Sequence, residues 1–404
     1  MRYSVTRQKA CYQCSSAKAK CDNNAAGCSR CTLRGLTCTY PVDAPTPASR
    51  SSQRRARRTI DDDQIAPAAL PLDAAATPAV GGNEGDREEA RDQLDFSCLD
   101  LVCPINADDI TTRWLHPYVP VPGQVTKDYH PRISDLIYRV LKSYANGVIS
   151  GTKPPPFVHA SQLQVPVPSP ALVNCLRIAR MCDKSHPSSD NSLAAEILQK
   201  EMAKIGEQAT LPAVADIDLL ATFQAHIIYT MILFFHLYQS DGEGEKLSLS
   251  VLRQAMMSLQ DLAGTASRQG LVGRAAADRP RWEAWLVAEA KRRTLYVLYL
   301  FDNVLSRHEG LPTFLGTELR GLPAPAGGAL WTASTRREWE ARYDADLAQW
   351  SEDGGLRIDE LWAVPPGLDE VGVARRRDRV DRWLVDVDAF GMMIYTVTSC
   401  THGG

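Results

Sequence analysis

The chain has 404 residues, of which 44% are hydrophobic and 23% are charged, a composition that excludes a wholly disordered or collagen-like protein. This length allows about two or three domains. The net charge of −3 conceals an asymmetry, because residues 1–58 contain twelve Lys and Arg against two acids and carry a net charge of +10. A basic head on an acidic remainder indicates that the head binds a polyanion.

Six of the eleven cysteines form two copies of the pattern Cys-x2-Cys-x6-Cys near the N-terminus, at Cys11, Cys14, Cys21, Cys28, Cys31 and Cys38. No apolar run follows the N-terminal cations, so we expect no secretory signal and a reducing compartment, where dense cysteines bind metal rather than form disulfides. Zinc prefers four tetrahedral ligands. Six thiolates therefore satisfy one zinc with two left over, or two zincs if two sulfurs bridge both metals.

The third cysteine of the pattern is surrounded by charged residues, at Lys18, Lys20 and Asp22. This arrangement resembles the fungal binuclear zinc-cluster transcription factors. The resemblance implies a small zinc-stabilised module over residues 7–40, with two short helices and two Zn²⁺ ions held by the six cysteines, of which Cys11 and Cys28 are the bridges. It also implies that the first helix enters the major groove of double-stranded DNA at GC-rich, CGG-like half-sites.

Lys18 occupies the position where this family places its base-reading lysine, and lysine donates hydrogen bonds to the O6 and N7 acceptors of guanine. Phosphate contacts position a protein without specifying sequence, and we expect them from Lys20, Lys9, Arg7, Arg30 and Arg34. The alternative for Lys18 and Lys20 is a solvated pair that balances the anionic cluster. Many members have basic residues where this chain has Ser15, Ser16 and Ala17, so weaker phosphate binding is expected.

Residues 41–95 consist mainly of Pro, Ala, Ser, Thr, Gly and charged residues, which predicts a disordered linker. A basic cluster within it is interpreted as a nuclear-import signal or a second contact with the DNA backbone, rather than a solubilising charge run, at Arg54, Arg55, Arg57 and Arg58. The acidic stretch 84–100 is interpreted as a tether, with an activating segment as the alternative. No three sustained heptads follow, so either the rest of the chain supplies homodimer contacts or the protein binds DNA as a monomer.

From residue 96 to 404, apolar residues recur at helical spacing and predict an all-helical regulatory domain. The predicted helices are 131–146, 170–183, 191–205, 216–239, 246–262, 281–307, 336–350 and 378–395. Gly147 is predicted to end the first of them. Residues 219–238 lack a formal charge over a length that can span a bilayer, but their polar side chains favour a buried core helix. We therefore expect no membrane partner.

The helix predicted at 281–307 carries an ordered set of residues that continues beyond it: Trp285-Leu286, Glu289, Arg292-Arg293-Thr294, Leu311-Pro312 and Leu330-Trp331. This order resembles the middle-homology helical domain of the same fungal regulators, over about residues 170–335. Glu289 stands three and four residues before Arg292 and Arg293, the spacing of helical ion pairs. We expect a structural ion pair at the margin of a packed surface, with a ligand-binding pair as the alternative.

Two pairs of chemically versatile side chains lie in the predicted helices. His226 and His236 point in directions about 80° apart around one helix, so we interpret them as satisfied core histidines rather than a metal pair. Cys175 and Cys182 share a helical face and are interpreted as buried small hydrophobes rather than a redox switch. The sequence contains no phosphate-binding glycine loop, G-x-S-x-G or H-E-x-x-H motif, so we do not expect an enzyme.

These observations predict a nuclear, zinc-dependent, sequence-specific DNA-binding regulator of RNA polymerase II genes that acts on the transcription machinery. The family resemblance and the modest length favour a regulator of one pathway or of a secondary-metabolite gene cluster. The alternative is a helical small-molecule sensor or scaffold whose zinc cluster no longer reads DNA.

Overall fold

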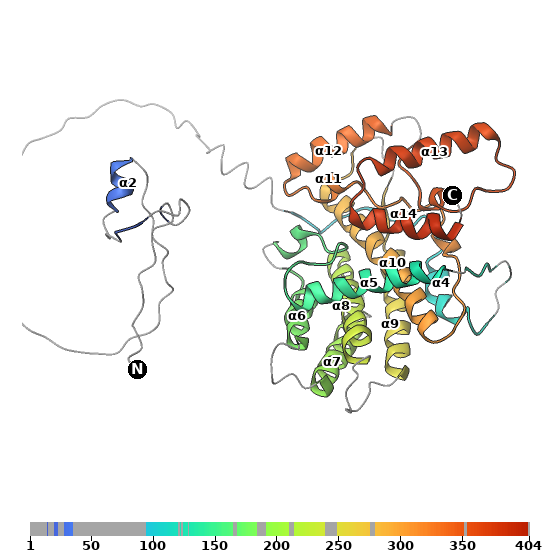
Figure 1. Ribbon diagram of the computed structural model, residues 1–404, viewed down its shortest axis with the longest axis horizontal. Coiled ribbons are helices and arrows are strands. Elements are labelled where there is room, and N and C mark those ends of the chain that lie inside the picture. Colours follow the sequence, from blue (N-terminus) through green and yellow to red (C-terminus); the bar gives the residue numbers. More distant parts are fainter. Residues whose placement is uncertain are drawn as a thin grey trace, which may run out of the picture. The chain divides into compact units, whose positions relative to one another are not determined.

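The computed structural model describes residues 14, 20–22, 28–34, 94–119, 122, 124–127, 129–164, 168–183, 191–209, 214–238, 249–274, 279–350 and 354–402. The chain divides into two compact units, the N-terminal unit Met1–Ala79 and the helical body Val80–Gly404. In the N-terminal unit, helix α2 spans Ser29–Leu33 (Figure 1).

The helical body is built mainly from helices (Figure 1). Their order is α4 Ala107–Thr112, η1 Arg113–Leu115, α5 Pro131–Ile149, η2 Ala160–Leu163, α6 Pro170–Ala179, η3 Arg180–Cys182, α7 Asn191–Ala209, α8 Asp216–Ile232, η4 Leu233–Tyr238, α9 Leu249–Arg268, α10 Trp282–His308, η5 Thr317–Leu319, α11 Gly328–Trp331, α12 Arg336–Gln349, η6 Ile358–Leu361, α13 Glu370–Leu384 and α14 Ala389–His402. Of these, η4 is a π-helical continuation of α8. The mostly helical character predicted from the sequence is confirmed.

Two short strands depart from the all-helical prediction. Strand β1, Leu101–Val102, pairs antiparallel with β2, Val272–Gly273, so that Leu101 lies opposite Gly273. Gly270 precedes β2 with a φ of +122°, and a Cβ there would lie 2.7 Å from the backbone carbon of Leu101. Only glycine fits this close approach. Strands of two residues are too short to produce the alternation by which a sequence reveals them.

Helix α8 forms the centre of the core. Every residue from Leu219 to Ile232 is buried, and α8 packs against α6, α7, α9 and α10. The segment Asp216–Tyr238 is long and apolar enough to cross a membrane, yet 89% of its most apolar stretch is buried inside the body. A helix that is apolar all round belongs at the centre of a large fold, as the sequence predicted for this segment.

Several helix boundaries differ from the predicted ones for identifiable reasons. Helix α5 continues through Gly147 and ends near Gly151, whose φ of +65° provides the left-handed turn that often follows a helix. The single helix predicted at 378–395 is wrong, because α13 ends at Leu384 and α14 begins at Ala389. Between them, the Asp388 carboxylate accepts a hydrogen bond from the backbone N–H of Gly391 at 2.8 Å and caps α14.

The ion pair on α10 lies inside the body, so its predicted place at the margin of a packed surface is wrong. Glu289 and Arg293 have no exposed side-chain surface, and their Oε1 and Nε atoms are 2.7 Å apart. Arg292 donates to the second Glu289 oxygen. Although burial raises the pKa of Glu289, the two guanidinium groups outweigh it and hold this pKa below its usual value.

Arg293 connects α10 to distant parts of the chain. Its Nη1 lies 2.6 Å from the carboxylate of Asp388, its Nη2 donates to the carbonyl of Ala326 at 3.0 Å, and its guanidinium stacks 4.3 Å from the ring centroid of Trp331. The backbone N–H of Ala326 in turn donates to Glu289 at 2.9 Å. The structural interpretation of this ion pair therefore fits the contacts, because every partner belongs to the fold.

Candidate metal centre

The short helix α2 brings two of the predicted zinc ligands together. Cys28 is the N-cap residue of α2 and has an extended backbone, and its sulfur accepts a hydrogen bond from the backbone N–H of Cys31 at 3.4 Å. The Cys-x2-Cys spacing thus places both sulfurs at the start of one helix turn. Both side chains are fully buried.

Cys28 belongs to two groups of metal-ligand atoms. Its sulfur lies within 4.8 Å of those of Cys14 and Cys31, and a second group with the same spacing joins it to Cys21 and Asp22. The sulfurs of Cys14 and Cys28 are 3.5 Å apart and form no disulfide. Three thiol groups from separate parts of the pattern therefore converge on that of Cys28, and the soft sulfur atoms of all four suit zinc.

The described part of the N-terminal unit has no hydrophobic core of aliphatic or aromatic side chains. Its buried cluster consists of Cys14, Cys28 and Cys31, with Cys21 packed against them, while Leu33 is 87% exposed. Sulfurs gathered without surrounding apolar side chains fit a site whose stability comes from metal bonds rather than from buried hydrocarbon.

Asp22 fixes the approach to α2. Its carboxylate accepts hydrogen bonds from the hydroxyl and from the backbone N–H of Ser29, at 3.1 Å for the nearer N–H contact. These bonds lower the pKa of Asp22 and keep it ionised near the positive end of the helix. The sequence pointed to Asp22 only as part of the family pattern, and the residue that gives it a physical role is Ser29.

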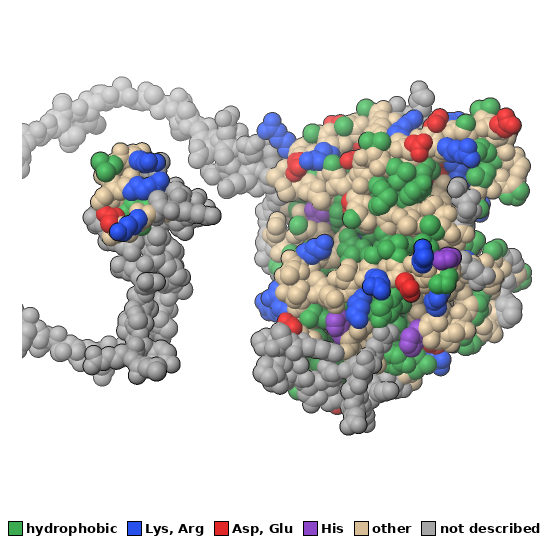
Figure 2. All heavy atoms as spheres, viewed as in Figure 1, with side chains coloured by type: hydrophobic (Ala, Val, Ile, Leu, Met, Phe, Trp, Pro, Cys, Tyr) green, Lys and Arg blue, Asp and Glu red, His purple; other side chains and the backbone are tan. Residues whose placement is uncertain are grey.

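Basic side chains surround the sulfurs. Arg30 directs Nη1 to the sulfur of Cys14 at 3.8 Å, where its charge offsets that of a thiolate. Lys20 and Arg34 are exposed, and Figure 2 shows Lys and Arg side chains on the outside of this unit. Arg30 thus already has a partner within the cluster, which its predicted contact with phosphate did not anticipate.

Of the predicted site residues, the structure describes the ligands Cys14, Cys21, Cys28 and Cys31 and the predicted DNA contact Lys20. The first four come together and Lys20 lies on the exterior beside them. The other predicted residues lie outside the described part of the chain: Cys11, Cys38, Lys18, Lys9, Arg7, Arg54, Arg55, Arg57 and Arg58.

The cysteines and the histidine singled out in the helical body differ in how well burial suits their side chains. Cys175 and Cys182 are buried as expected, and burial raises the pKa of both thiols, that of Cys182 to about 11. A thiol with a raised pKa carries little reactive thiolate. His226 is also buried, with only 2% of its surface exposed. Its imidazole lies close to the backbone of Ala255, but neither ring nitrogen makes a hydrogen bond of normal geometry within the described part of the chain. The expectation of a core histidine is confirmed, whereas its polar atoms are at most weakly satisfied.

Comparison with known proteins agrees with this geometry. Residues 9–47 match the family model of the fungal Zn(2)-Cys(6) binuclear cluster domain, so the chain carries this domain and its two zinc ions. Over 379 residues, which cover 85% of this chain and 87% of the other, the sequence is 22% identical to transcription factor gsfR2 of Penicillium aethiopicum. No solved structure matches the chain.

Proposed function

We propose that the protein is a nuclear regulator of transcription that binds specific double-stranded DNA sequences through its two-zinc cluster and is not an enzyme. The observation that carries this proposal is the convergence of three buried or half-buried cysteines on Cys28, inside a segment with the length and spacing of the zinc-cluster domain. The likeness to a transcription factor over most of both chains supports the regulatory role.

Cys28 is proposed as one of the two sulfurs that bridge both metals. It is the member shared by the two ligand groups, and the second bridge is expected to be Cys11. Two zinc ions and six thiolates leave the cluster with a net charge of −2, which Arg30 beside Cys14 helps to offset. The remaining ligands are Cys14, Cys21, Cys31 and Cys38.

Base recognition is proposed for Lys18, and phosphate contacts for Lys20, Lys9 and Arg7. The exposed position of Lys20 suits such a contact, because phosphates are reached from the outside of a small domain. A half-site of about three base pairs specifies little sequence, so the choice between homodimer and monomer decides how a longer site is read. A pathway or secondary-metabolite gene cluster is the proposed target.

Selection of binding sites from random double-stranded DNA, with the full chain at one stated salt concentration, tests this function. The wild type should enrich GC-rich half-sites and bind them on the order of 10³-fold more tightly than random DNA. Cys28→Ala should lose this binding, whereas Cys98→Ala, at an exposed cysteine of the helical body, should retain it. A wild type without preference between selected and random DNA would replace this proposal with the sensor or scaffold alternative.

A further inference from the structure

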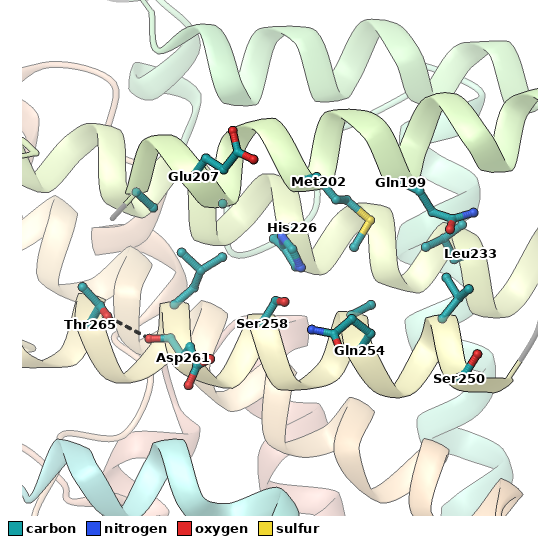
Figure 3. Close-up of a pocket in the computed structure, with 16 residues that line it drawn as sticks. Gln199, Met202, Glu207, His226, Leu233, Ser250, Gln254, Ser258, Asp261 and Thr265 are labelled. Atoms are coloured by element: carbon teal, nitrogen blue, oxygen red, sulfur yellow. Dashed lines mark hydrogen bonds between the residues drawn. The ribbon is translucent and has the colours of Figure 1, made fainter. Parts of the chain in front are cut away.

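A deep groove opens on the helical body between α7 and α9, with α8 beneath it (Figure 3). Its volume is about 1050 Å³, at the upper end of the range typical of small-molecule sites. Some of the residues that line it are buried, among them Met202 of α7 and Leu262 of α9. The groove is thus a depression with an apolar floor rather than a flat surface between two helices.

His226 of α8 lies at the bottom of the groove and is the unusual residue there. Figure 3 shows its ring between α7 and α9, in the space that the groove residues surround. Only 2% of His226 is exposed. The backbone of Ala255 lies close to the imidazole, but neither ring nitrogen makes a hydrogen bond of normal geometry with a residue that the structure describes. An unpaired buried polar group costs about 1–3 kcal/mol. A molecule that enters the groove and pairs with this imidazole would recover that cost.

The wall formed by α7 contains small residues between larger ones such as Gln199 and Met202. Ala203, Gly206 and Ala209 line the groove at intervals of three residues, and a Cβ placed on Gly206 would meet no atom within 4 Å. Ala255 and Ser258 of α9 line the groove on the other side. The small side chains on the two helices leave open space between the larger ones, into which a small molecule can fit.

The charges around the groove limit what it can hold. The charged residues among its described lining are both acids, Glu207 and Asp261. They disfavour an anionic ligand. Burial lowers the pKa of His226 to about 4, although the contact with the backbone of Ala255 acts in the opposite direction. The imidazole is therefore neutral, with one nitrogen that donates and one that accepts.

We infer that this groove is a binding site for an uncharged and mainly apolar small molecule with a hydroxyl group that pairs with His226. A hydroxyl suits a neutral imidazole because it donates and accepts one hydrogen bond each. A docked helix from another protein would cover the apolar floor but would reach His226 with a polar group only by chance. The inference concerns the helical body and does not depend on the proposed DNA binding.

Equilibrium dialysis of the zinc-loaded full chain against three probes tests the inference. The probes are 2-naphthol, naphthalene, which lacks the hydroxyl group, and 2-naphthoate, which carries a negative charge. We expect the wild type to bind 2-naphthol about 10-fold more tightly than naphthalene, as one well-placed hydrogen bond allows. Binding of 2-naphthoate should be weaker than that of either neutral probe.

Two variants locate the site. Gly206→Leu places a side chain in the open space without a clash, and leucine favours helix, so the fold should persist while binding of 2-naphthol falls at least 10-fold. Gln208→Leu, at an exposed position of the same helix, should bind like the wild type. His226→Phe should remove the preference for 2-naphthol over naphthalene.

Three outcomes would overturn the inference: no probe binds the folded wild type, Gly206→Leu binds as well as Gln208→Leu, or 2-naphthoate binds as tightly as 2-naphthol. Zinc content and DNA binding are measured on the same samples. A failure of DNA binding with intact groove binding would contradict the proposed function alone, and the reverse result would contradict this inference alone.

Discussion

The N-terminal unit and the helical body use opposite means of stability. In the N-terminal unit, the described buried side chains are cysteines, and a few metal bonds replace a hydrophobic core. In the helical body, more than a dozen consecutive residues of α8 are buried, and the body also buries charged groups such as Glu289 and Arg293. The fold of the N-terminal unit therefore depends on the number and spacing of its metal ligands. The fold of the helical body depends on side-chain packing, which the hydrophobic pattern of the sequence predicts only in outline.

The largest effect is expected at the buried ion pair of α10. Arg293→Ala would leave Glu289 without its i,i+4 partner inside the body, and removal of one member of a buried pair costs about 3–5 kcal/mol. The matched control is Arg342→Ala, whose pair with Glu338 is 2.8 Å long but more than one-third exposed on both sides and should cost at most about 1 kcal/mol. Urea unfolding measures both values. Equal losses in the two variants would show that the buried pair has no special role.

The pH dependence of stability also distinguishes the two units, because protonation of the buried imidazoles changes the free energy of unfolding of the helical body. Burial lowers the pKa of His226 and His159 to about 4, below the value of about 6.5 in an unfolded chain. The unfolded state therefore takes up protons first, and stability should fall as the pH decreases from 6.5 to 4. The free energy of unfolding should decrease by about 3 kcal/mol for each histidine, as the difference in pKa between the folded and unfolded states requires.

The tryptophans provide the measurement, since all eight lie in the helical body. Urea unfolding followed by their fluorescence should show a shallower pH dependence in His226→Phe than in the wild type. His130→Asn, at the exposed start of α5, is the control and should keep the wild-type slope. An unchanged slope in His226→Phe would mean that this imidazole is not protonated on unfolding.

The third prediction distinguishes recognition of DNA bases from contact with DNA phosphates within the N-terminal unit. Lys18→Ala should cost about 1–3 kcal/mol on the preferred DNA and relax selection at one or two guanines. Lys9→Ala should weaken binding to all sequences alike and reduce the salt dependence by about one unit of slope. Binding to selected and random DNA across a salt series distinguishes the two. Equal losses on both DNAs for Lys18→Ala would make Lys18 a phosphate contact.

The sequence predicts different features of the two units, because metal ligands and packed helices leave different patterns in it. Cysteine spacing alone predicted that the cysteines that meet at Cys28 lie together, because metal geometry allows few arrangements. Helical periodicity predicted α8 and α10 closely. It did not predict the break before Asp388, because Val385 and Val387 continue the apolar spacing, nor the depth of Glu289, because ion-pair spacing is the same on a surface and in a core. The unpaired state of His226 depends on neighbours from other helices.

The smallest expected effect concerns the basic cluster of the linker. Replacement of Arg54, Arg55, Arg57 and Arg58 with Ala should reduce the nuclear share of a fluorescently tagged protein. Basic residues of the zinc-cluster domain remain, so the reduction is expected to be partial. Replacement of Arg375 and Arg377 on α13 with Ala is the control for a general loss of positive charge. An unchanged nuclear share in the linker variant would leave this cluster as a solubilising charge run.

The most direct test of the two-zinc account is removal of the metal from the full chain while both units are followed. The untreated protein should contain two zinc ions per chain. Complete chelation should abolish binding to the selected DNA, because the described residues of the N-terminal unit form no other core, and should leave tryptophan fluorescence and the unfolding of the helical body unchanged. One zinc per chain, or specific DNA binding that survives complete removal of zinc, would contradict the account.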